Sequence, residues 1–214
     1  IFKPKDIVAG DFYWIEKRKD TILFAAADST GHGVPGAIVS VICNYALNRS
    51  LKEFGLSRPG EILDKTREIV VSEFERSDED VKDGMDIALC SITGNKLSFA
   101  GANNPLWIIR NNEIIVIPAN RQAIGKTENP KPFKNNIIDI LQGDTLYIFS
   151  DGFVDQFGGP KGKKLKVQPF KNLLIGIQDE KMSKQKQIIE QFFNDWKADN
   201  EQVDDVCIIG FRVE

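Results

Sequence analysis

The chain has 214 residues, of which 42% are hydrophobic and 28% are charged, a balance that suits a globular protein with an ample core. Its formal net charge of −3 argues against non-specific nucleic-acid binding, because such binding depends on clustered lysine and arginine. No apolar run approaches the roughly 20 residues needed to span a bilayer, and no signal peptide is visible. We therefore expect a soluble domain located in the cytoplasm.

Nothing along the chain looks like a linker between domains, so we expect a single domain over residues 1–214. Because the first residue is Ile1 rather than Met, we expect this domain to be part of a longer protein. The three cysteines, Cys43, Cys90 and Cys207, lie far apart in apolar segments. Their odd number and spacing favour buried thiols in a reducing compartment over disulfides or a zinc site.

The N-terminal third predicts a hairpin followed by a long helix. Residues 11–16 and 21–27 are rich in aromatic, β-branched and small apolar side chains, so they predict two paired strands that bring Asp11 near Asp28. Helical periodicity follows over residues 35–54, with proline at a permissible first-turn position. The apolar stripe expected on this helix contains Ile38, Ile42, Tyr45, Ala46 and Leu51.

A second helix is predicted over residues 57–74, because Ser57 can cap its first turn and Pro59 is tolerated there. Residues 75–83 are expected to form a charged turn. Four short strands separated by good turn sequences then predict a meander, over residues 87–92, 96–100, 106–110 and 113–117.

The C-terminal part returns to mixed structure. Strands are predicted over residues 137–141 and 145–149, followed by a glycine-rich surface loop over 151–166. Helices are predicted over 169–177 and 183–196, and a last strand over 206–213. Strands outnumber helices along the whole chain and are mostly joined by tight turns. We therefore expect antiparallel sheets rather than a doubly wound parallel sheet.

Four aspartates, Asp11, Asp28, Asp151 and Asp204, stand at the edges of these apolar runs. An aspartate beside glycine usually marks a turn, because its side chain bonds to nearby backbone. Here the neighbouring runs read as strands, so several strand ends would carry carboxylates toward one place. Like charges gathered at a sheet edge repel one another, and the usual remedy is a hard divalent cation held by oxygen ligands and water.

Six short motifs follow one another along the chain. They are Gly10-Asp11-Phe12-Tyr13, Ala27-Asp28-Ser29-Thr30-Gly31-His32-Gly33-Val34-Pro35-Gly36-Ala37, Asp83-Gly84-Met85-Asp86-Ile87-Ala88-Leu89, Ala100-Gly101-Ala102-Asn103-Asn104-Pro105-Leu106, Gly143-Asp144 followed by Phe149-Ser150-Asp151-Gly152, and Asp204-Asp205-Val206. Together they resemble the magnesium- or manganese-dependent protein phosphatases of PPM type, in the bacterial SpoIIE/RsbU-like branch. The resemblance implies an α+β fold, a four-layer αββα sandwich of two antiparallel sheets flanked by helices.

The resemblance also implies hydrolysis of phosphoserine or phosphothreonine by a water that two Mn²⁺ or Mg²⁺ ions activate, without a phosphoenzyme intermediate. Such an ion pair lowers the pKa of a shared water and draws charge from the phosphoryl oxygens. By residue-wise comparison, Asp28 would bridge the ions and Ser29 would supply a backbone carbonyl. Asp11 would act at one ion, and Asp151 and Asp204 would hold the other.

Five further residues are secondary candidates: His32, Asp83, Asp86, Asn103 and Asp205. His32 is either a general acid, because histidine titrates near neutrality, or a turn residue bonded to backbone. Asp83 and Asp86 lie near where some relatives bind a third ion, although Asp86 also suits a hydrogen-bonded position at the mouth of the site. Asn103 either lines the site or forms a turn, and Asp205 is either a ligand or a cap of the last strand.

By the same resemblance, the substrate is a phosphorylated regulatory protein, namely an anti-sigma-factor antagonist or a similar domain. A sensory or membrane module is expected to precede the domain, which itself contacts neither membrane nor nucleic acid, and a homodimer is one expected assembly. A catalytically silent binding module in a signalling complex is the alternative, and retention of all four aspartates argues against it. A dimetal hydrolase of nucleic acid or small phosphoesters is disfavoured by the acidic charge balance and the lack of a basic, aromatic groove.

Overall fold

Two five-stranded antiparallel sheets form the centre of the protein in the computed structural model, which describes residues 1–75 and 83–214. The first sheet has the order β2 (Phe12–Arg18), β3 (Thr21–Ser29), β4 (Met85–Thr93), β5 (Lys96–Ala102) and β8 (Asn136–Asp139). The second has the order β1 (Phe2–Lys3), β12 (Val206–Arg212), β9 (Thr145–Phe149), β6 (Leu106–Arg110) and β7 (Glu113–Ile117).

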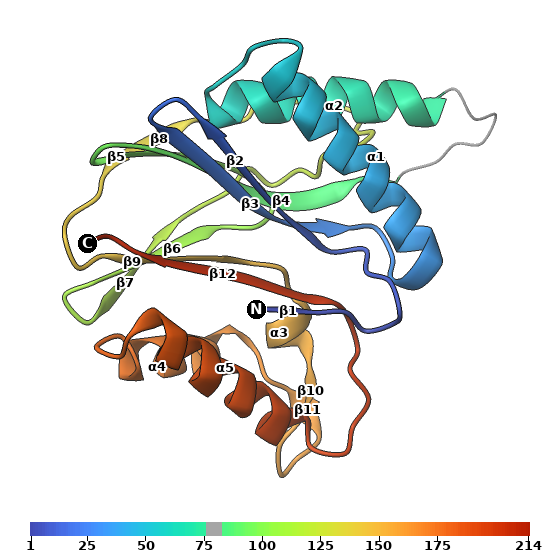
Figure 1. The fold of residues 1–214 in the computed structure, drawn as a ribbon. Coiled ribbons are helices and arrows are strands. Elements are labelled where there is room, and N and C mark those ends of the chain that lie inside the picture. Colours follow the sequence, from blue (N-terminus) through green and yellow to red (C-terminus); the bar gives the residue numbers. More distant parts are fainter. Residues whose placement is uncertain (76–82) are drawn as a thin grey trace.

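Helices cover the outer face of each sheet (Figure 1). The first sheet carries α1 (Gly33–Lys52) and α2 (Pro59–Glu75), and the second carries α4 (Val167–Gly176) and α5 (Met182–Lys197). This arrangement confirms the expected four-layer sandwich and its antiparallel sheets. None of the helices in the described part of the chain combines the length and hydrophobicity that crossing a bilayer requires.

Three layers of buried apolar side chains hold the sandwich together, one under each pair of helices and one between the sheets. In β3, alternate residues serve different layers: Leu23, Ala25 and Ala27 face the helices, whereas Phe24 and Ala26 face the second sheet. This follows from the two-residue period of a strand. By the same period Asp28, the next even position, belongs to the face between the sheets.

The predicted N-terminal hairpin is confirmed. Strands β2 and β3 pair antiparallel, with Phe12 opposite Ala27. Asp11 directly precedes Phe12 and Asp28 directly follows Ala27. This register therefore sets both carboxylates at the same end of the first sheet.

The predicted meander is wrong. Strands β4 and β5 form one hairpin and β6 and β7 another, but β5 continues to β8 in the first sheet whereas β6 pairs with β9 in the second. The chain crosses between the sheets through Asn103, whose φ is 57°, and Pro105, which lacks the N–H needed to continue a ladder. Turn signals alone do not distinguish a hairpin from a crossover to the facing sheet.

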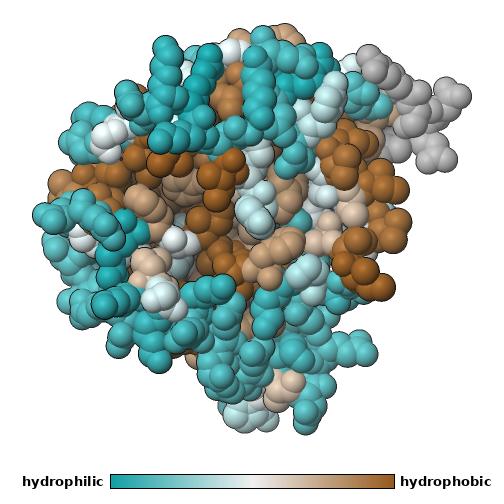
Figure 2. Space-filling model, viewed as in Figure 1, coloured by the Kyte–Doolittle hydropathy of each residue, from teal (hydrophilic) through white to brown (hydrophobic). Residues whose placement is uncertain are grey.

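The apolar stripe expected on α1 is also wrong in part. Ala46 and Leu51 are buried as expected, but Ile38 and Tyr45 are 59% and 50% exposed. The helix has apolar side chains on several faces, so its periodicity does not single out the buried one. The buried residues are Gly33, Gly36, Val39, Cys43, Ala46, Leu47, Ser50 and Leu51. Figure 2 shows apolar surface over α1, where Val34, Ile38, Val41 and Tyr45 are exposed.

The segment 151–166, expected to be a surface loop, contains the short helix α3 (Gly152–Asp155) and a hairpin of β10 (Phe157–Gly158) with β11 (Lys163–Lys164). The charged turn expected at 75–83 lies outside the described residues except for its first and last positions.

The two faces of α1 should respond differently to truncation. Leu47→Ala removes a fully buried side chain, so we expect it to lower the free energy of unfolding by about 2–5 kcal/mol. Ile38→Ala, the matched control on the exposed face, should change it by no more than about 0.5 kcal/mol. Urea unfolding measures the free energy of unfolding of both variants. Equal losses would mean that Ile38 is packed as closely as Leu47, as the stripe expected from the sequence requires.

Candidate metal centre

Five aspartates meet at one end of the sandwich. Asp11 and Asp28 lie there through the β2–β3 register, and Asp86 is the direct partner of Asp28 on β4. Asp151 follows the end of β9, and Asp204 precedes the start of β12. Because β9 and β12 are antiparallel neighbours, the end of one and the start of the other lie at the same edge of the second sheet.

Asp11 is the most deeply buried of the five, with 3% of its surface exposed, and its Oδ2 has no hydrogen-bond partner. Burial raises the pKa of Asp11 to about 9, and the charge of Asp28 adds to the effect, while the Ser150 hydroxyl opposes it. A carboxyl group in this position favours its neutral form unless a cation compensates its charge. Sequence reasoning missed Ser150, although its place directly before Asp151 was a usable signal.

Asp28 lies between the other carboxylates. Burial raises its pKa to about 8, followed by the charges of Asp151, Asp204 and Asp86, while the backbone N–H of Asp151 opposes the shift. Asp11 in turn responds to the charge of Asp28. Asp28 thus interacts with carboxylates that both sheets contribute, as Asp11 does through Asp28 and Asp204.

The remaining members are closer to solvent. Asp151 is exposed, and its pKa is raised, first because neighbouring atoms exclude water from its carboxylate and then by the charges of Asp155 and Asp204. Asp204 is half-buried, and its Oδ1 accepts a hydrogen bond of 2.8 Å from the backbone N–H of Asp205.

The oxygen atoms gathered here fit a hard divalent cation. Within residues 1–75 and 83–214, no three acidic, histidine or cysteine side chains are close enough together to hold a cation as they stand. However, Asp11 Oδ2 is buried without a partner, and burial together with neighbouring negative charge raises the pKa values of Asp11 and Asp28. Carboxylate oxygens are donors that Mg²⁺ and Mn²⁺ prefer, and a bound cation would remove the repulsion.

The secondary candidates lie in three different settings. His32 is exposed before α1, where its Nδ1 and Nε2 lie 2.9 Å from Asp6 Oδ2 and Lys5 Nζ. Asn103 donates a hydrogen bond of 2.8 Å to Asp86 Oδ1, so both are at the edge of the aspartate group. Burial raises the pKa of the Cys43 thiol in α1 to about 12, and the charge of Asp83 adds to this shift.

Asp205 differs from its neighbour Asp204. It is buried, with 1% of its surface exposed, and both carboxylate oxygens accept hydrogen bonds from backbone N–H groups. These donors belong to the segment that leads into β2. Backbone N–H groups therefore donate to the Asp205 carboxylate, whereas Asp11 Oδ2 has no such partner.

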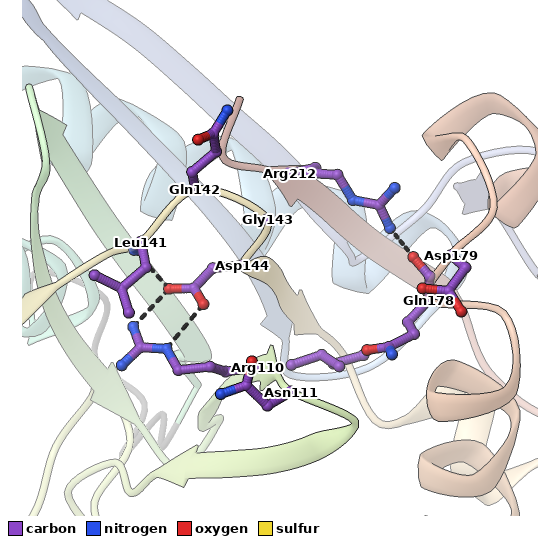
Figure 3. A pocket seen from close by; sticks show the side chains of 10 residues that line it. Arg110, Asn111, Leu141, Gln142, Gly143, Asp144, Gln178, Asp179 and Arg212 are labelled. Atoms are coloured by element: carbon purple, nitrogen blue, oxygen red, sulfur yellow. Dashed lines mark hydrogen bonds and ion pairs between the residues drawn. The ribbon is translucent and has the colours of Figure 1, made fainter.

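A separate cavity of about 360 Å³ lies at the opposite end of β9. Figure 3 shows Arg110 facing Asp144 across two hydrogen bonds, of 2.8 and 2.6 Å, and Arg212 facing the carbonyl of Gln178. Arg212 also donates to the carbonyl of Glu180. Both guanidinium groups are thus already bonded within the protein, and this cavity does not rival the aspartate group as a site.

The sequence profile of one family, Stage II sporulation protein E (SpoIIE), matches residues 18–214. The chain belongs to the SpoIIE family. It is a phosphatase domain of PPM type, also called PP2C type. The matched residues include Asp28, Asp151 and Asp204, whereas Asp11 lies before them.

Individual relatives agree with this assignment. The chain is 24% identical over 155 residues to phosphoserine phosphatase RsbU of Bacillus subtilis strain 168, covering 71% of the chain and 44% of RsbU. It therefore spans less than half the length of that relative. The SiaA-PP2C domain of Pseudomonas aeruginosa is 28% identical and has a TM-score of 0.92, covering 100% of this chain and 85% of that one.

The fold is also that of the SpoIIE PP2C domain from Bacillus subtilis, solved with a fragment of its regulatory domain. That structure has a TM-score of 0.78 at 18% identity, covering 99% of this chain and 61% of that one. At this identity the comparison supports the architecture alone.

The metal-free protein should lose stability as the pH rises. Asp11 and Asp28 have folded-state pKa values of about 9 and about 8, against 3.8 for an ordinary aspartate. Between the ordinary and the folded-state pKa values, the folded protein binds more protons than the unfolded chain. The stability that these protons contribute is therefore fully present below about pH 4 and is lost as the pH rises through the folded-state pKa values.

Urea unfolding with chelator at several pH values between 6 and 9 measures this slope, with Asp28→Asn as the comparison. The variant should show a shallower slope, because one of the two groups no longer titrates. A wild-type protein that becomes more stable over this range would contradict the expected electrostatics.

Proposed function

We propose that this domain hydrolyses phosphoserine or phosphothreonine on a regulatory protein, using two Mn²⁺ or Mg²⁺ ions. The proposal rests mainly on Asp11, Asp28, Asp151 and Asp204, which both sheets contribute to one end of the sandwich. Their oxygen donors suit hard cations. Membership of a phosphatase family supports the reaction class.

The ions would supply two things that phosphate ester hydrolysis needs, a lowered water pKa and neutralised phosphoryl oxygens. We assign Asp28 as the shared ligand from the family resemblance, and the interactions of its carboxylate with Asp11, Asp151 and Asp204 support this role. In this proposal Asp11 serves one ion and Asp151 with Asp204 the other. The backbone carbonyl of Ser29, directly after Asp28, is the remaining protein ligand.

The protein's own residues also shape the entrance to the site. Asn103 donates a hydrogen bond to Asp86 at the edge of the site. This contact supports the hydrogen-bonded role for Asp86, and the binding of a third ion there is the alternative. The contacts of His32 are with the side chains of Asp6 and Lys5 and not with backbone as expected, and they support a role in ordering the turn before α1. A general-acid role would require the ring to leave those two partners.

The proposed substrate is a phosphorylated anti-sigma-factor antagonist or a similar small domain. RsbU is by name a phosphoserine phosphatase, and an RsbU domain occurs together with an RsbW domain in Rv1364c of Mycobacterium tuberculosis. We further propose that the domain works within a longer protein with an N-terminal sensory module. The exposed apolar face of α1 formed by Val34, Ile38, Val41 and Tyr45 supports a homodimer, because its spacing of four, three and four residues matches a helix-pairing seam.

A catalytically silent binding module remains the alternative, because the carboxylates do not form a compact ligand set among the described residues. Hydrolysis of a generic aryl phosphate with and without Mn²⁺ separates the two. Metal-dependent turnover would exclude the silent module, whereas no turnover at any Mn²⁺ concentration would exclude the phosphatase.

Asp28→Asn should abolish turnover while the domain stays folded, because a shared ligand that loses its charge weakens both ions together. Activity on an aryl phosphate at saturating Mn²⁺ measures the effect, and circular dichroism checks the fold. Asp20→Asn, an exposed aspartate in the turn at the other end of the same hairpin, is the control and should keep full activity. A folded Asp28→Asn that retains more than about a tenth of wild-type activity would refute the bridging role.

Asp151→Ala and Asp204→Ala should each weaken Mn²⁺ binding, and the double variant should be little worse than either single one. The reason is that residues holding one ion act as a unit, so their losses do not add. Calorimetric titration of the three variants tests this. Independent, additive losses would place the two aspartates at separate ions.

A further inference from the structure

One buried carboxylate supports the segment that carries Asp11. Asp205 Oδ1 accepts a hydrogen bond of 2.7 Å from the backbone N–H of Lys5. Its Oδ2 accepts one of 2.7 Å from Gly10 and a longer one of 3.4 Å from Asp11 itself. The segment from Lys5 to Asp11 is therefore bonded at both ends to a residue nearly two hundred positions later in the chain.

The backbone of Asp205 is fixed as firmly as its side chain. Its N–H donates to Asp204 Oδ1 at 2.8 Å. Its carbonyl oxygen lies against Gly152, where a Cβ atom would come within 1.9 Å of it. Asp205 thus contacts Asp204 directly. It also packs against Gly152, the residue that follows Asp151.

The other side of the Asp11 segment is closed by a second contact. The carbonyl oxygen of Gly31 lies between Gly10 and Gly36, and Cβ atoms at these positions would stand 2.2 and 2.1 Å from it. The segment is therefore held between the Asp205 carboxylate and the Gly31 carbonyl, which restricts where Asp11 can stand.

We propose that Asp205 is a positioning residue of the metal centre and not a ligand, and that it sets the place of Asp11 relative to Asp28. Its carboxylate accepts three backbone hydrogen bonds, two of them in buried positions, and releasing a buried N–H group to bind a cation would be unfavourable. The consequence for cation affinity rests on the proposed function. The control of the Asp11 segment rests on the observed hydrogen bonds alone.

The chemistry explains why a carboxylate is needed here. Asp205 presents two acceptor oxygens to N–H donors on two sides, whereas asparagine has one acceptor oxygen and an NH₂ group that only donates. In Asp205→Asn, either Lys5 or Gly10 would therefore face another donor. The side chain keeps its size, so the substitution tests hydrogen bonding without creating a cavity.

The experiment compares Asp205→Asn with two other substitutions. Asp204→Asn changes the adjacent proposed ligand, and Asp144→Asn changes another buried aspartate, 2% exposed, at the opposite end of the sandwich. Two quantities are measured for each protein. They are Mn²⁺ affinity by calorimetry and amide hydrogen exchange at Gly10 and Asp11 in the metal-free state.

We expect Asp205→Asn to weaken Mn²⁺ binding by about 10-fold or more and to accelerate exchange at Gly10 and Asp11. Asp204→Asn should weaken Mn²⁺ binding without changing exchange at Gly10. Asp144→Asn should lower stability and leave both quantities unchanged. Unaltered exchange at Gly10 and Asp11 in Asp205→Asn would overturn the inference. If the wild type binds Mn²⁺, an affinity of Asp205→Asn within about twofold of the wild-type value would also overturn it.

The wild-type protein supplies a test that does not depend on the variant folding. Without metal, the amides of Lys5 and Gly10 should be protected from exchange because Asp205 accepts from them, and rapid exchange there would also overturn the inference. If the wild type binds no Mn²⁺ at all, the proposed function fails. Exchange at Gly10 and Asp11 then still decides whether Asp205 holds the segment.

Discussion

Repulsion among carboxylates at one end of the sandwich is the constraint on which the rest of the structure depends. The two ends of β9 show the contrast. At its start, the buried Asp144 is compensated within the protein by the guanidinium of Arg110. Beyond its other end lies Asp151, close to Asp28 and Asp204; burial raises the pKa of Asp28, and the charges of Asp151 and Asp204 raise it further. A fold that places such groups together stores unfavourable charge that a cation can relieve.

The fold tolerates this repulsion because rigid elements fix the carboxylates. Asp28 lies within β3, which has neighbours on both sides, and Asp204 leads into β12, which pairs with β9. Antiparallel pairing turns large sequence separations into proximity, since the end of one strand always adjoins the start of its neighbour. Asp11 alone precedes an edge strand, and it is the position that Asp205 secures through its loop.

Much of the fold could be predicted from sequence because local patterns determine local elements. The β2–β3 hairpin, the helix pair α1–α2 and the strand preceding Asp151 follow from periodicity and turn residues. The crossover at Asn103 and Pro105 could not be predicted in this way, because the same residues also suit a tight turn. The buried face of α1 was ambiguous, since Ile38 and Leu47 are both apolar and only packing against β3 distinguishes them.

The candidate site was predictable to a similar degree. Its aspartates stand out as polar residues beside strands, so their gathering could be anticipated from topology. The partners of Asp205 could not, because its bonds to Lys5 and Gly10 join opposite ends of the chain and leave no local pattern. The contacts of His32 with Asp6 and Lys5 were missed for a related reason, since all three residues lie outside regular elements.

The tight fit of the Gly31 carbonyl between Gly10 and Gly36 has a mechanical consequence. Gly36 belongs to the first turns of α1 and Gly10 to the approach to Asp11, so the helix and this approach meet at a tight backbone contact. A displacement of α1 would therefore press on the Asp11 segment, because close-packed backbone atoms leave little room to take up the motion. A force applied to the exposed side of this helix would thus change the distances between the carboxylates.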